Sequence, residues 1–232
     1  MIGIIGAMES EVLTLCNALE DKKEIKAGGY TFNQGKISGK DVVVVKSGIG
    51  KVNSALCAQL LILKFNADKL INTGIAGATG GNLGIFDFVV STQTVYHDFD
   101  TTAFGYKIGQ VPGMVERFPA DKKLGELALT AFDKTEFSKE HKAVIGVIAS
   151  GDQFISDSKQ KKTIQVNFDP SCVEMEGAAI AHACYLNKIP FVIVRCMSDM
   201  ADETVEQTYS FNEDICAAAS ACLVLKMIEL AD

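Results

Sequence analysis

Residues 172–177, Cys172-Val-Glu174-Met-Glu176-Gly, and residues 195–199, Arg195-Cys-Met-Ser-Asp199, decide the fold. The first stretch follows the Asp169-Pro170-Ser171 turn, and the second follows the apolar run 189–194. Between them, residues 177–186 are rich in small residues and predict a helix. This pattern predicts a β-α-β unit, and open α/β sheets bind ligands outside the carboxyl ends of their strands. We therefore expect two Glu, one Arg and one Asp to meet in one crevice.

Strand-like and helix-like segments alternate along the rest of the chain. Strands are expected at residues 2–6, 30–37, 41–45, 70–74, 86–96, 143–149, 173–175 and 189–194. Helices are expected at residues 9–19, from about 51 to 65, at 124–132, at 177–186 and from about 212 to 230. Residues 97–119 are expected to form a long ordered loop. The alternation indicates an α/β layer structure, and 232 residues suit a single domain over residues 1–232.

The composition and charge of the chain limit the classes of molecule that it is expected to bind. The chain is 48% hydrophobic with four Pro, and its formal net charge is −7. Its densest basic stretch, residues 159–162, is interrupted by Gln160. Phosphate contacts need clustered Lys and Arg, so no nucleic acid is expected as a partner. A small neutral or cationic substrate fits this charge balance better.

The same composition argues for a cytoplasmic protein. Met1 leads directly into a strand-like run without a basic leader, so no signal peptide is expected. The longest uncharged apolar run, residues 215–225, is too short to span a bilayer, so no membrane association is expected. The seven Cys show no C-x-x-C spacing and stand mostly in apolar segments. They are expected to be free thiols in a reducing compartment.

Several glycine and histidine patterns exclude cofactor sites. Gly3 and Gly6 lack the third glycine of a dinucleotide-binding fingerprint, and residues 47–51 do not form a P-loop. His97-Asp98 is not part of a ligand cluster, because the chain has three His in all. No metal and no cofactor is therefore expected. The glycine-rich residues 74–81 predict a backbone that approaches a ligand closely, which Gly permits at low cost.

Six motifs together carry a specific resemblance. They are Ile4-Ile-Gly-Ala-Met-Glu-Ser-Glu11-Val, Ser47-Gly-Ile-Gly-Lys-Val52, Asn72-Thr-Gly-Ile-Ala-Gly77, Ser150-Gly-Asp-Gln-Phe-Ile155, Val173-Glu-Met-Glu-Gly177 and Arg195-Cys-Met-Ser-Asp199. This set resembles that of the 5′-methylthioadenosine/S-adenosylhomocysteine nucleosidases, in the family's order and over nearly the whole chain. The resemblance places the chain in the nucleoside phosphorylase superfamily. It implies a three-layer α/β/α fold whose central mixed sheet is partly closed like a barrel.

The resemblance implies roles for four catalytic residues. Asp199 matches the general acid that protonates adenine N7, and Ser198 matches the residue that orients it. Glu11 matches the residue that activates the attacking water, and Arg195 helps to hold that site. One departure is Ile75, where some relatives have Ser, so a hydroxyl contact near the water is lost there.

The resemblance also implies a substrate pocket. Glu176 matches the ligand of the ribose hydroxyls, Met175 packs under the sugar, Phe154 stacks on adenine, and the Ile155 backbone reads the edge of the base. The remaining substrate-binding residues implied are Glu174, Gly77, Met8, Ile49 and Phe211. Phe104 and Pro112 match a pair that each subunit of a homodimer lends to the 5′-substituent pocket of its partner.

The chemistry requires two carboxyl groups in opposite states. Adenine leaves well only when a ring nitrogen is protonated, and water must reach the anomeric carbon from the opposite face, as in inverting glycosidases. Asp199 must then hold a proton near pH 7, which means a pKa raised by roughly 3 units. Burial beside Phe154 acts in that direction. Glu11 must stay ionised, with Arg195 as the counter-charge expected for it.

The expected activity is hydrolysis of 5′-methylthioadenosine, S-adenosylhomocysteine and 5′-deoxyadenosine, with a role in methionine salvage. One alternative is a purine nucleoside phosphorylase, which would line the same site with more basic groups than Arg195. The other is a non-catalytic purine-binding relative, which would lack the acid or the base. Both Glu11 and Asp199 are present.

Overall fold

The structure is a computed structural model that describes residues 1–80, 82–203 and 205–231, with side chains for all of these except 205–211. Its strands are β1 Ile2–Gly6, β2 Glu20–Ala27, β3 Tyr30–Ile37, β4 Lys40–Lys46, β5 Lys69–Ala78, β6 Phe88–Tyr96, β7 Phe118–Pro119, β8 Ala143–Ser150, β9 Cys172–Glu174 and β10 Phe191–Asp199. Its α-helices are α1 Glu9–Asn17, α2 Lys51–Phe65, α3 Lys122–Phe132, α4 Ser158–Phe168, α5 Gly177–Asn187 and α6 Val205–Leu230. Two 3-10 helices span Thr102–Phe104 and Glu136–Lys139.

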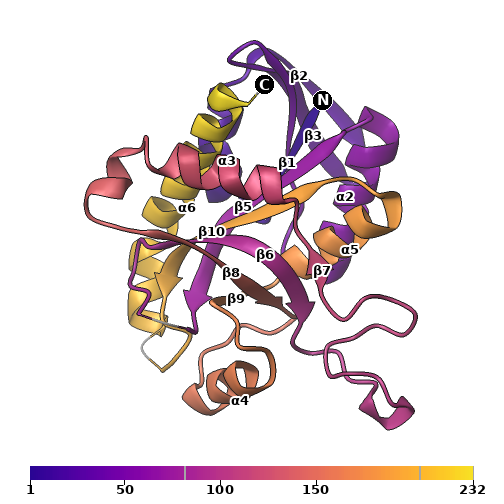
Figure 1. Ribbon diagram of the computed structural model, residues 1–232. Helices are drawn as coiled ribbons and strands as arrows, with labels where there is room; N and C mark the ends of the chain where they lie inside the picture. The colour runs from indigo at the N-terminus through magenta and orange to yellow at the C-terminus, as the bar shows by residue number, and fades with distance from the viewer. Residues whose placement is uncertain (81, 204, 232) are drawn as a thin grey trace.

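The strands form one mixed sheet that closes on itself at one end (Figure 1). The order is β10-β6-β8-β9-β5-β1-β4-β3-β2, and β10 also pairs with β5. The five strands β5, β10, β6, β8 and β9 therefore make a ring, from which β1, β4, β3 and β2 extend. This confirms the predicted mixed, partly barrel-like sheet.

Strand β5 is the centre of the sheet. One of its edges pairs in parallel with β10, and the other pairs first with β1, in parallel, and then with β9, antiparallel. Nine of its ten residues are buried, from Leu70 to Ala78. A strand covered on both faces needs such a continuous apolar or small-residue run.

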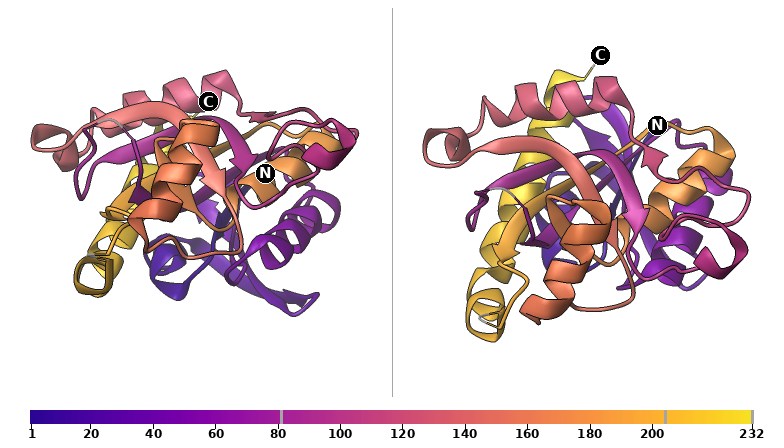
Figure 2. Two further views of the ribbon diagram at one scale, coloured as in Figure 1. Left: turned by 90° about the horizontal axis from the view of Figure 1, so that it is seen from below. Right: turned by 60° about the horizontal axis from the view of Figure 1, so that its bottom comes forward.

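Helices cover both faces of the sheet (Figures 1 and 2). Helices α2 and α5 pack together on one face, where their buried side chains share a core with Phe32, Val43 and Leu70. Helices α1, α3 and α6 pack on the other face, over Ile4, Val44 and Val192. This arrangement confirms the predicted α/β/α layers. Helix α4 lies outside these layers, and Ile164 and Phe168 join it to a small third core.

The predicted β-α-β unit was wrong in its geometry. Strands β9 and β10 are not neighbours, because β5 lies between them, and they run in opposite directions along it. Strand β9 has only three residues, and its first two, Cys172 and Val173, pair with Ala78 and Gly77 at the carboxyl end of β5. Chain leaving β9 therefore turns back along β5 toward Gly74, which pairs with Arg195. The charged side chains still converge, although the strands are not parallel.

Other element boundaries differ in ways that have local causes. The first helix ends at Asn17 instead of Leu19, and residues 20–27, which the sequence analysis left unassigned, form the exposed edge strand β2. Charged residues on such an edge discourage pairing with other chains. Strand β6 starts at Phe88, because Phe86 has a φ of 68°, outside the strand region. Strand β10 continues to Asp199, so residues 195–199, which were expected to follow the strand, form its second half.

Helix α4 was also missed, because its sequence is strongly polar. Its start is fixed by Asp157, whose side chain accepts hydrogen bonds from the backbone N–H groups of Lys159 and Gln160. Only two of its side chains, Ile164 and Phe168, are buried. Two anchors over three turns give too weak a hydrophobic pattern for prediction from sequence.

These two anchors generate a stability prediction. Ile164 is 4% exposed, and Val166 on the same helix is 76% exposed. Ile164→Ala should lower the free energy of unfolding by about 2–5 kcal/mol through lost burial and a cavity. Val166→Ala is the matched control and should change it by less than about 0.5 kcal/mol. Urea unfolding monitored by circular dichroism measures both, and equal effects would contradict the assignment of Ile164 to the core.

Candidate active site

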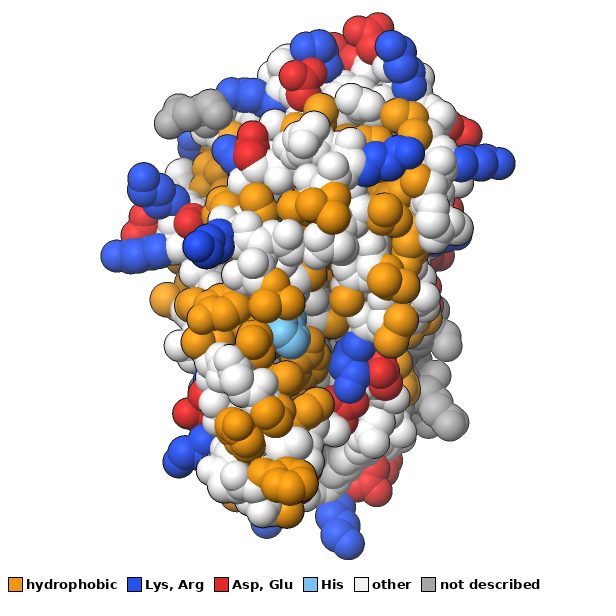
Figure 3. Space-filling model, turned by 90° about the vertical axis from the view of Figure 1, so that its right-hand side faces the viewer, with side chains coloured by type: hydrophobic (Ala, Val, Ile, Leu, Met, Phe, Trp, Pro, Cys, Tyr) orange, Lys and Arg blue, Asp and Glu red, His pale blue; other side chains and the backbone are white. Residues whose placement is uncertain are grey.

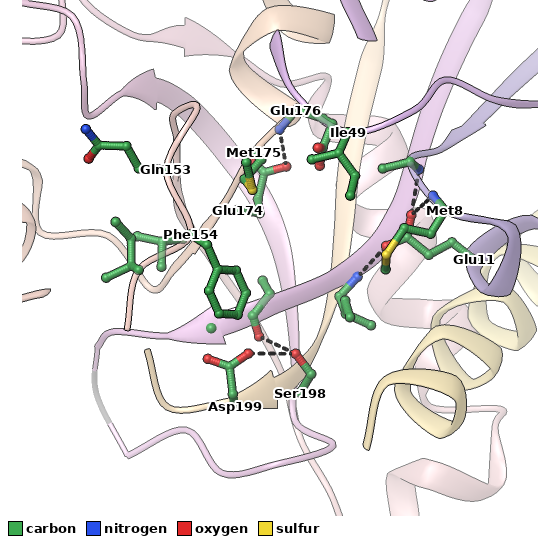
Figure 4. A pocket seen from close by; sticks show the side chains of 16 residues that line it. Met8, Glu11, Ile49, Gln153, Phe154, Glu174, Met175, Glu176, Ser198 and Asp199 are labelled. Carbon is green, nitrogen blue, oxygen red and sulfur yellow. Dashed lines mark hydrogen bonds between the residues drawn. The ribbon is translucent and has the colours of Figure 1, made fainter. Parts of the chain in front are cut away.

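A cavity of about 620 Å³, including its open mouth, lies where the carboxyl ends of several strands meet (Figure 4). It is lined by Ala7, Met8, Glu11, Ile49, Ile75, Ala76, Gly77, Gln153, Phe154, Ile155, Val173, Glu174, Met175, Glu176, Ser198 and Asp199. These residues come from β1 and α1, from the loop after β4, and from β5, β8, β9 and β10 or the segments that follow them. The volume is in the range of small-molecule sites.

Glu11 is held at the N-terminus of its own helix. Its Oε2 accepts hydrogen bonds from the backbone N–H groups of Ala7 (2.6 Å) and Met8 (3.1 Å), and its Oε1 accepts one from Ile75 (3.1 Å). The carboxyl group is buried. Burial raises the pKa of Glu11, while Arg195 and the three backbone donors act against that rise. Its neighbour Glu9 is exposed and pairs with Lys46, as a surface residue of a first helical turn would.

Two glycines of β5 make room for the carboxyl groups. A Cβ at Gly74 would lie 2.4 Å from Oε1 of Glu11 and 2.9 Å from Nη1 of Arg195. A Cβ at Gly77 would lie 2.7 Å from Oδ1 of Asp199. This backbone was expected to approach a ligand, and Gly77 does line the cavity. The protein's own charged side chains also approach it closely.

Asp199 ends β10 and is 3% exposed. Its Oδ2 accepts a hydrogen bond from Ser198 Oγ (2.8 Å), and its Oδ1 accepts one from the backbone N–H of Ala201 (2.8 Å) (Figure 4). Burial raises the pKa of Asp199, and these two hydrogen bonds oppose the rise. Phe154, which was expected to bury it, is half exposed, although its ring points into the cavity. Much of the burial of Asp199 therefore comes from β5 and from Ala201.

Arg195 lies behind the cavity wall and is 1% exposed. Its Nη2 donates to Glu174 Oε2 and to Asn72 Oδ1, and it lies 3.8 Å from Glu176 Oε2. Its direct ion pair is therefore with Glu174. Arg195 also lies close to Glu11 across Gly74, where its charge opposes the rise in the pKa of Glu11, although no ion pair joins the two groups in the described residues.

Glu176 joins two segments at the cavity. Its Oε1 accepts a hydrogen bond from the backbone N–H of Gly50 (2.9 Å), in the loop that carries Ile49. Gly50 has a φ of 97°, a conformation that favours glycine. Burial, together with the charge of Glu174, raises the pKa of Glu176 to about 8, against the opposing effect of Arg195.

The structure brings together most of the residues expected in the site. Met8, Ile49, Phe154, Ile155 and Met175 line the cavity with the residues described above. Arg195 stands behind its wall. Phe104, which is 80% exposed, and Pro112 lie in the loop between β6 and β7 and do not line the cavity of their own chain. The side chain of Phe211 lies outside the described residues.

Sequence reasoning assigned no role to several residues that the structure places here. Ala7, Ala76, Val173 and Gln153 line the cavity, and Ile75, noted only as a departure from relatives, holds Glu11 through its backbone. Contacts made by backbone N–H groups or by apolar cavity walls do not require a characteristic residue type, so the sequence gives no signal for them. Asn72 and Ser150 stood within the quoted motifs, and their contacts depend on the packing of strands.

The part of the chain that the structure describes contains neither a metal-binding cluster nor a membrane-spanning helix. No three His, Cys, Asp or Glu side chains among them are grouped as a metal ion would require. No helix in that part of the chain is long and apolar enough to cross a membrane.

Comparison with known proteins gives the family. The sequence profile of the phosphorylase superfamily matches residues 1–229. A 5′-methylthioadenosine/S-adenosylhomocysteine nucleosidase from Staphylococcus carnosus (strain TM300) is 43% identical over 230 residues, which cover 99% of both chains. This chain belongs to the 5′-methylthioadenosine/S-adenosylhomocysteine nucleosidase family. The resemblance inferred from the six motifs is thereby confirmed.

Two solved structures extend the comparison. The nucleosidase of Colwellia psychrerythraea 34H, crystallised in complex with adenine, matches with a TM-score of 0.94 at 43% identity, over 98% of this chain and 93% of that chain. The futalosine hydrolase of Helicobacter pylori strain 26695 matches with a TM-score of 0.92 at 34% identity, over 98% and 97%. Both share the whole architecture of this nucleosidase family member.

The raised pKa of Glu176 generates a prediction about stability and pH. Its ordinary value is 4.5 and its value in the folded protein is about 8. Between these values the folded protein binds more protons than the unfolded chain, so stability falls as pH rises, and the loss is complete above about pH 8. Glu176→Gln removes the charge and should raise the free energy of unfolding at pH 9 by roughly 2–4 kcal/mol, with little change at pH 4.

Urea unfolding at both pH values measures this difference. Glu9→Gln is the matched control, because Glu9 is an exposed carboxylate and should change stability by less than about 0.5 kcal/mol at either pH. A stabilisation by Glu176→Gln that is equal at pH 4 and pH 9 would contradict the raised pKa.

Proposed function

We propose that this protein hydrolyses the N-glycosidic bond of 5′-methylthioadenosine and S-adenosylhomocysteine, releasing adenine and the 5-thioribose product. The observation that carries the proposal is that two buried carboxyl groups, Glu11 and Asp199, line one cavity from different elements, apart from each other (Figure 4). Cleavage through an oxocarbenium-like sugar needs an acid at the leaving base and a base at the attacking water, on opposite faces.

Asp199 is the proposed general acid. Its raised pKa favours the protonated form, and the proton passes to adenine N7 as the C–N bond breaks, so the base leaves neutral. Ser198 and Ala201 fix the carboxyl group from two directions, which orients the proton-bearing oxygen. Ser198 is thus a positioning residue for the acid.

Glu11 is the proposed general base. Its two oxygens are fixed by three backbone N–H groups, so the carboxylate is aimed before any substrate binds. It takes a proton from water as the C–O bond to the anomeric carbon forms. Arg195 adds a positive charge behind this site, which favours the ionised state of Glu11.

The remaining cavity residues suit an adenine nucleoside. In its ionised form, which predominates above its pKa of about 8, Glu176 offers carboxylate oxygens to the two ribose hydroxyls. Met175 provides an apolar surface under the sugar. Phe154, with its ring in the cavity, is placed to stack on adenine, and the Ile155 backbone to read the base edge. Met8, Ile49 and Phe211 are proposed to surround the 5′-substituent.

The 5′ end sets the range of substrates. The mouth of the cavity is open and partly apolar, with Ile49 half exposed beside it. This supports thioether substituents and also 5′-deoxyadenosine. The likeness to a futalosine hydrolase supports testing nucleosides with larger 5′ groups. We propose that residues 1–232 form a single nucleosidase domain, which removes these by-products in cytoplasmic methionine salvage. The seven free thiols fit a reducing compartment such as the cytoplasm.

The charge of the cavity favours water over phosphate. None of the described residues that line it is Lys, Arg or His, and Arg195 behind it is already paired with Glu174. A phosphate dianion near Glu11 would bring like charges together at a cost on the order of several kcal/mol. A phosphorylase is therefore the weaker candidate. A purine-binding protein without activity is weaker too, since both the acid and the base are in place.

Product identity tests the function directly. The purified protein should release adenine from 5′-methylthioadenosine at a rate that added phosphate leaves unchanged. The sugar product in phosphate buffer should be free methylthioribose, without a new sugar phosphate signal in phosphorus NMR. A sugar 1-phosphate signal that increases together with adenine release would contradict the nucleosidase and indicate a phosphorylase.

Two isosteric variants serve as controls in this assay. Asp199→Asn keeps the shape of the acid without its proton and should lose about 10²–10⁴-fold in kcat or more. Glu11→Gln cannot accept a proton and should lose turnover to a similar extent. A variant that retains a tenth of the wild-type rate would remove that residue from its proposed role.

A homodimer is part of the proposal. Exposed apolar side chains gather on the face formed by α2 and α5, including Val52, Leu56 and Leu63 of α2 and Tyr185 and Leu186 of α5 (Figure 3). The exposed Phe104 projects from the neighbouring loop. A two-fold dimer through this face would cover these side chains and bring Phe104 and Pro112 to the pocket of the partner.

If a dimer shares its sites, a residue that does not line the cavity of its own chain should affect substrate binding. Phe104→Ala should raise KM for 5′-methylthioadenosine more than it lowers kcat, because only packing against the 5′ group is lost. Val166→Ala, which truncates an exposed side chain on α4, is the control and should leave KM unchanged. Sedimentation under assay conditions should give a dimer, and a fully active monomer would contradict shared sites.

A further inference from the structure

The first three N–H groups at the start of α5 are held by two buried side chains. Glu174 Oε2 accepts from the backbone N–H groups of Glu176 (3.1 Å) and Gly177 (2.7 Å). Ser150 Oγ accepts from the N–H of Ala178 (2.7 Å) and donates its own proton to Glu174 Oε1. The N-terminal N–H groups of a helix have no partner within the helix, so these contacts fix where α5 begins. They therefore fix the backbone of Glu176.

The same Glu174 carboxylate also holds Arg195. Arg195 Nη2 donates to Glu174 Oε2 and to Asn72 Oδ1 (2.6 Å). Asn72 in turn donates through Nδ2 to the carbonyl oxygen of Ile5 (2.8 Å), at the end of β1 just before the backbone that holds Glu11. All the side chains in this series are buried. The contacts run from β8 through β9 and β10 to β5 and β1.

We propose that Ser150, Glu174 and Asn72 are positioning residues, a hydrogen-bonded series behind the cavity wall that fixes Glu176 and Arg195. This inference rests on the proposed function, in which Glu176 holds the ribose. Both oxygens of Glu174 are engaged by protein donors, Oε1 by Ser150 and Oε2 by Arg195 and the two amides. It therefore acts on the substrate through Glu176 and Arg195, in place of the direct binding expected from sequence.

The series also sets the charge felt by Glu176. The charged groups that face it are Glu174 from β9, Arg195 from β10 and Glu11 from α1. Glu174 raises the pKa of Glu176, and Arg195 lowers it. Replacing Glu174 by Gln removes the first effect and releases Arg195 to act on Glu176. The acid limb of the pH profile of kcat/KM should then move to lower pH.

Ser150→Ala is the main test, because it removes one hydroxyl from the series and leaves every charge in place. It should raise KM for 5′-methylthioadenosine by about tenfold, with kcat changed by less than about threefold, since the ribose contact is loosened. Hydrogen exchange of the Ala178 amide in the free protein should become about tenfold faster. Asn72→Ser is a second variant, which should lower kcat/KM by about tenfold by freeing Arg195.

Ser91→Ala is the matched control. Ser91 is a buried serine of β6 whose Oγ accepts from the backbone N–H of Ile193 (2.9 Å), away from the cavity. It should leave KM, kcat and the exchange of the Ala178 amide within about twofold of wild type. A merely structural role of Ser150 would give Ser150→Ala and Ser91→Ala the same profile, which overturns the proposal.

The outcomes separate this inference from the proposed function. Absence of adenine release by the wild type contradicts the function, and the amide exchange of the free variants still decides the positioning. Wild-type activity with an unchanged KM and unchanged exchange in Ser150→Ala overturns the positioning series alone. A Glu174→Gln pH profile that coincides with that of the wild type overturns its electrostatic part.

Discussion

The burial of Arg195 is the constraint on which the rest of the site depends. A guanidinium removed from water costs several kcal/mol unless charges and hydrogen bonds replace the solvent. Here the replacement comes from Glu174, Asn72 and, at a longer distance, Glu176. These partners come from two segments, β5 and the end of β9, and Arg195 itself belongs to β10, so the ion can be satisfied only when β5, β9 and β10 have their native arrangement. Because Glu174 and Glu176 are among the partners of Arg195, the need to satisfy the buried guanidinium also fixes the positions of these two carboxyl groups in the cavity.

Strand β5 makes this concentration of charge sterically feasible. Gly74 and Gly77 are the two points where carboxyl oxygens lie closer to the strand than any Cβ would allow. The N–H of Ile75, between them, donates to Glu11. A β-strand has free backbone donors only where its ladder is interrupted, and β5 changes partners there, from β1 to β9. The irregularity of the closed sheet is thus what makes the N–H of Ile75 available as a hydrogen-bond donor to Glu11.

Much of the fold followed from local sequence, and its failures have physical causes. Apolar runs such as residues 41–45 and 143–149 indicated their strands through β-branched side chains. Strand β2 and helix α4 were missed because each buries few side chains. The relation of β9 to β10 was wrong, since a three-residue strand carries no information about its neighbours. Closure of the barrel is a long-range pairing that no window of sequence contains.

For the candidate active site, the sequence indicated which residue types take part, but it did not indicate which of them contact one another. Six motifs were enough to select the family, because together they combine charged side chains with the glycines of β5 that make room for them. They did not show that Arg195 pairs with Glu174, because that contact depends on the turn of the chain after β9. In sequence, Ser150 looks like an ordinary polar residue at a strand end, and Asn72 like one within a strand. Their importance emerges only from the buried donors and acceptors that surround them.

Glu11 and Asp199, the two carboxyl groups proposed as base and acid, are both buried but differ in the groups that surround them. Burial raises the pKa of both Glu11 and Asp199. Three backbone donors and a buried guanidinium oppose the rise for Glu11, whereas Asp199 has one backbone donor and one hydroxyl, and Asp202 raises its pKa further. More groups that favour the ionised form therefore surround Glu11 than Asp199. This asymmetry is the one that the proposed roles require, with Glu11 as the base and Asp199 as the acid.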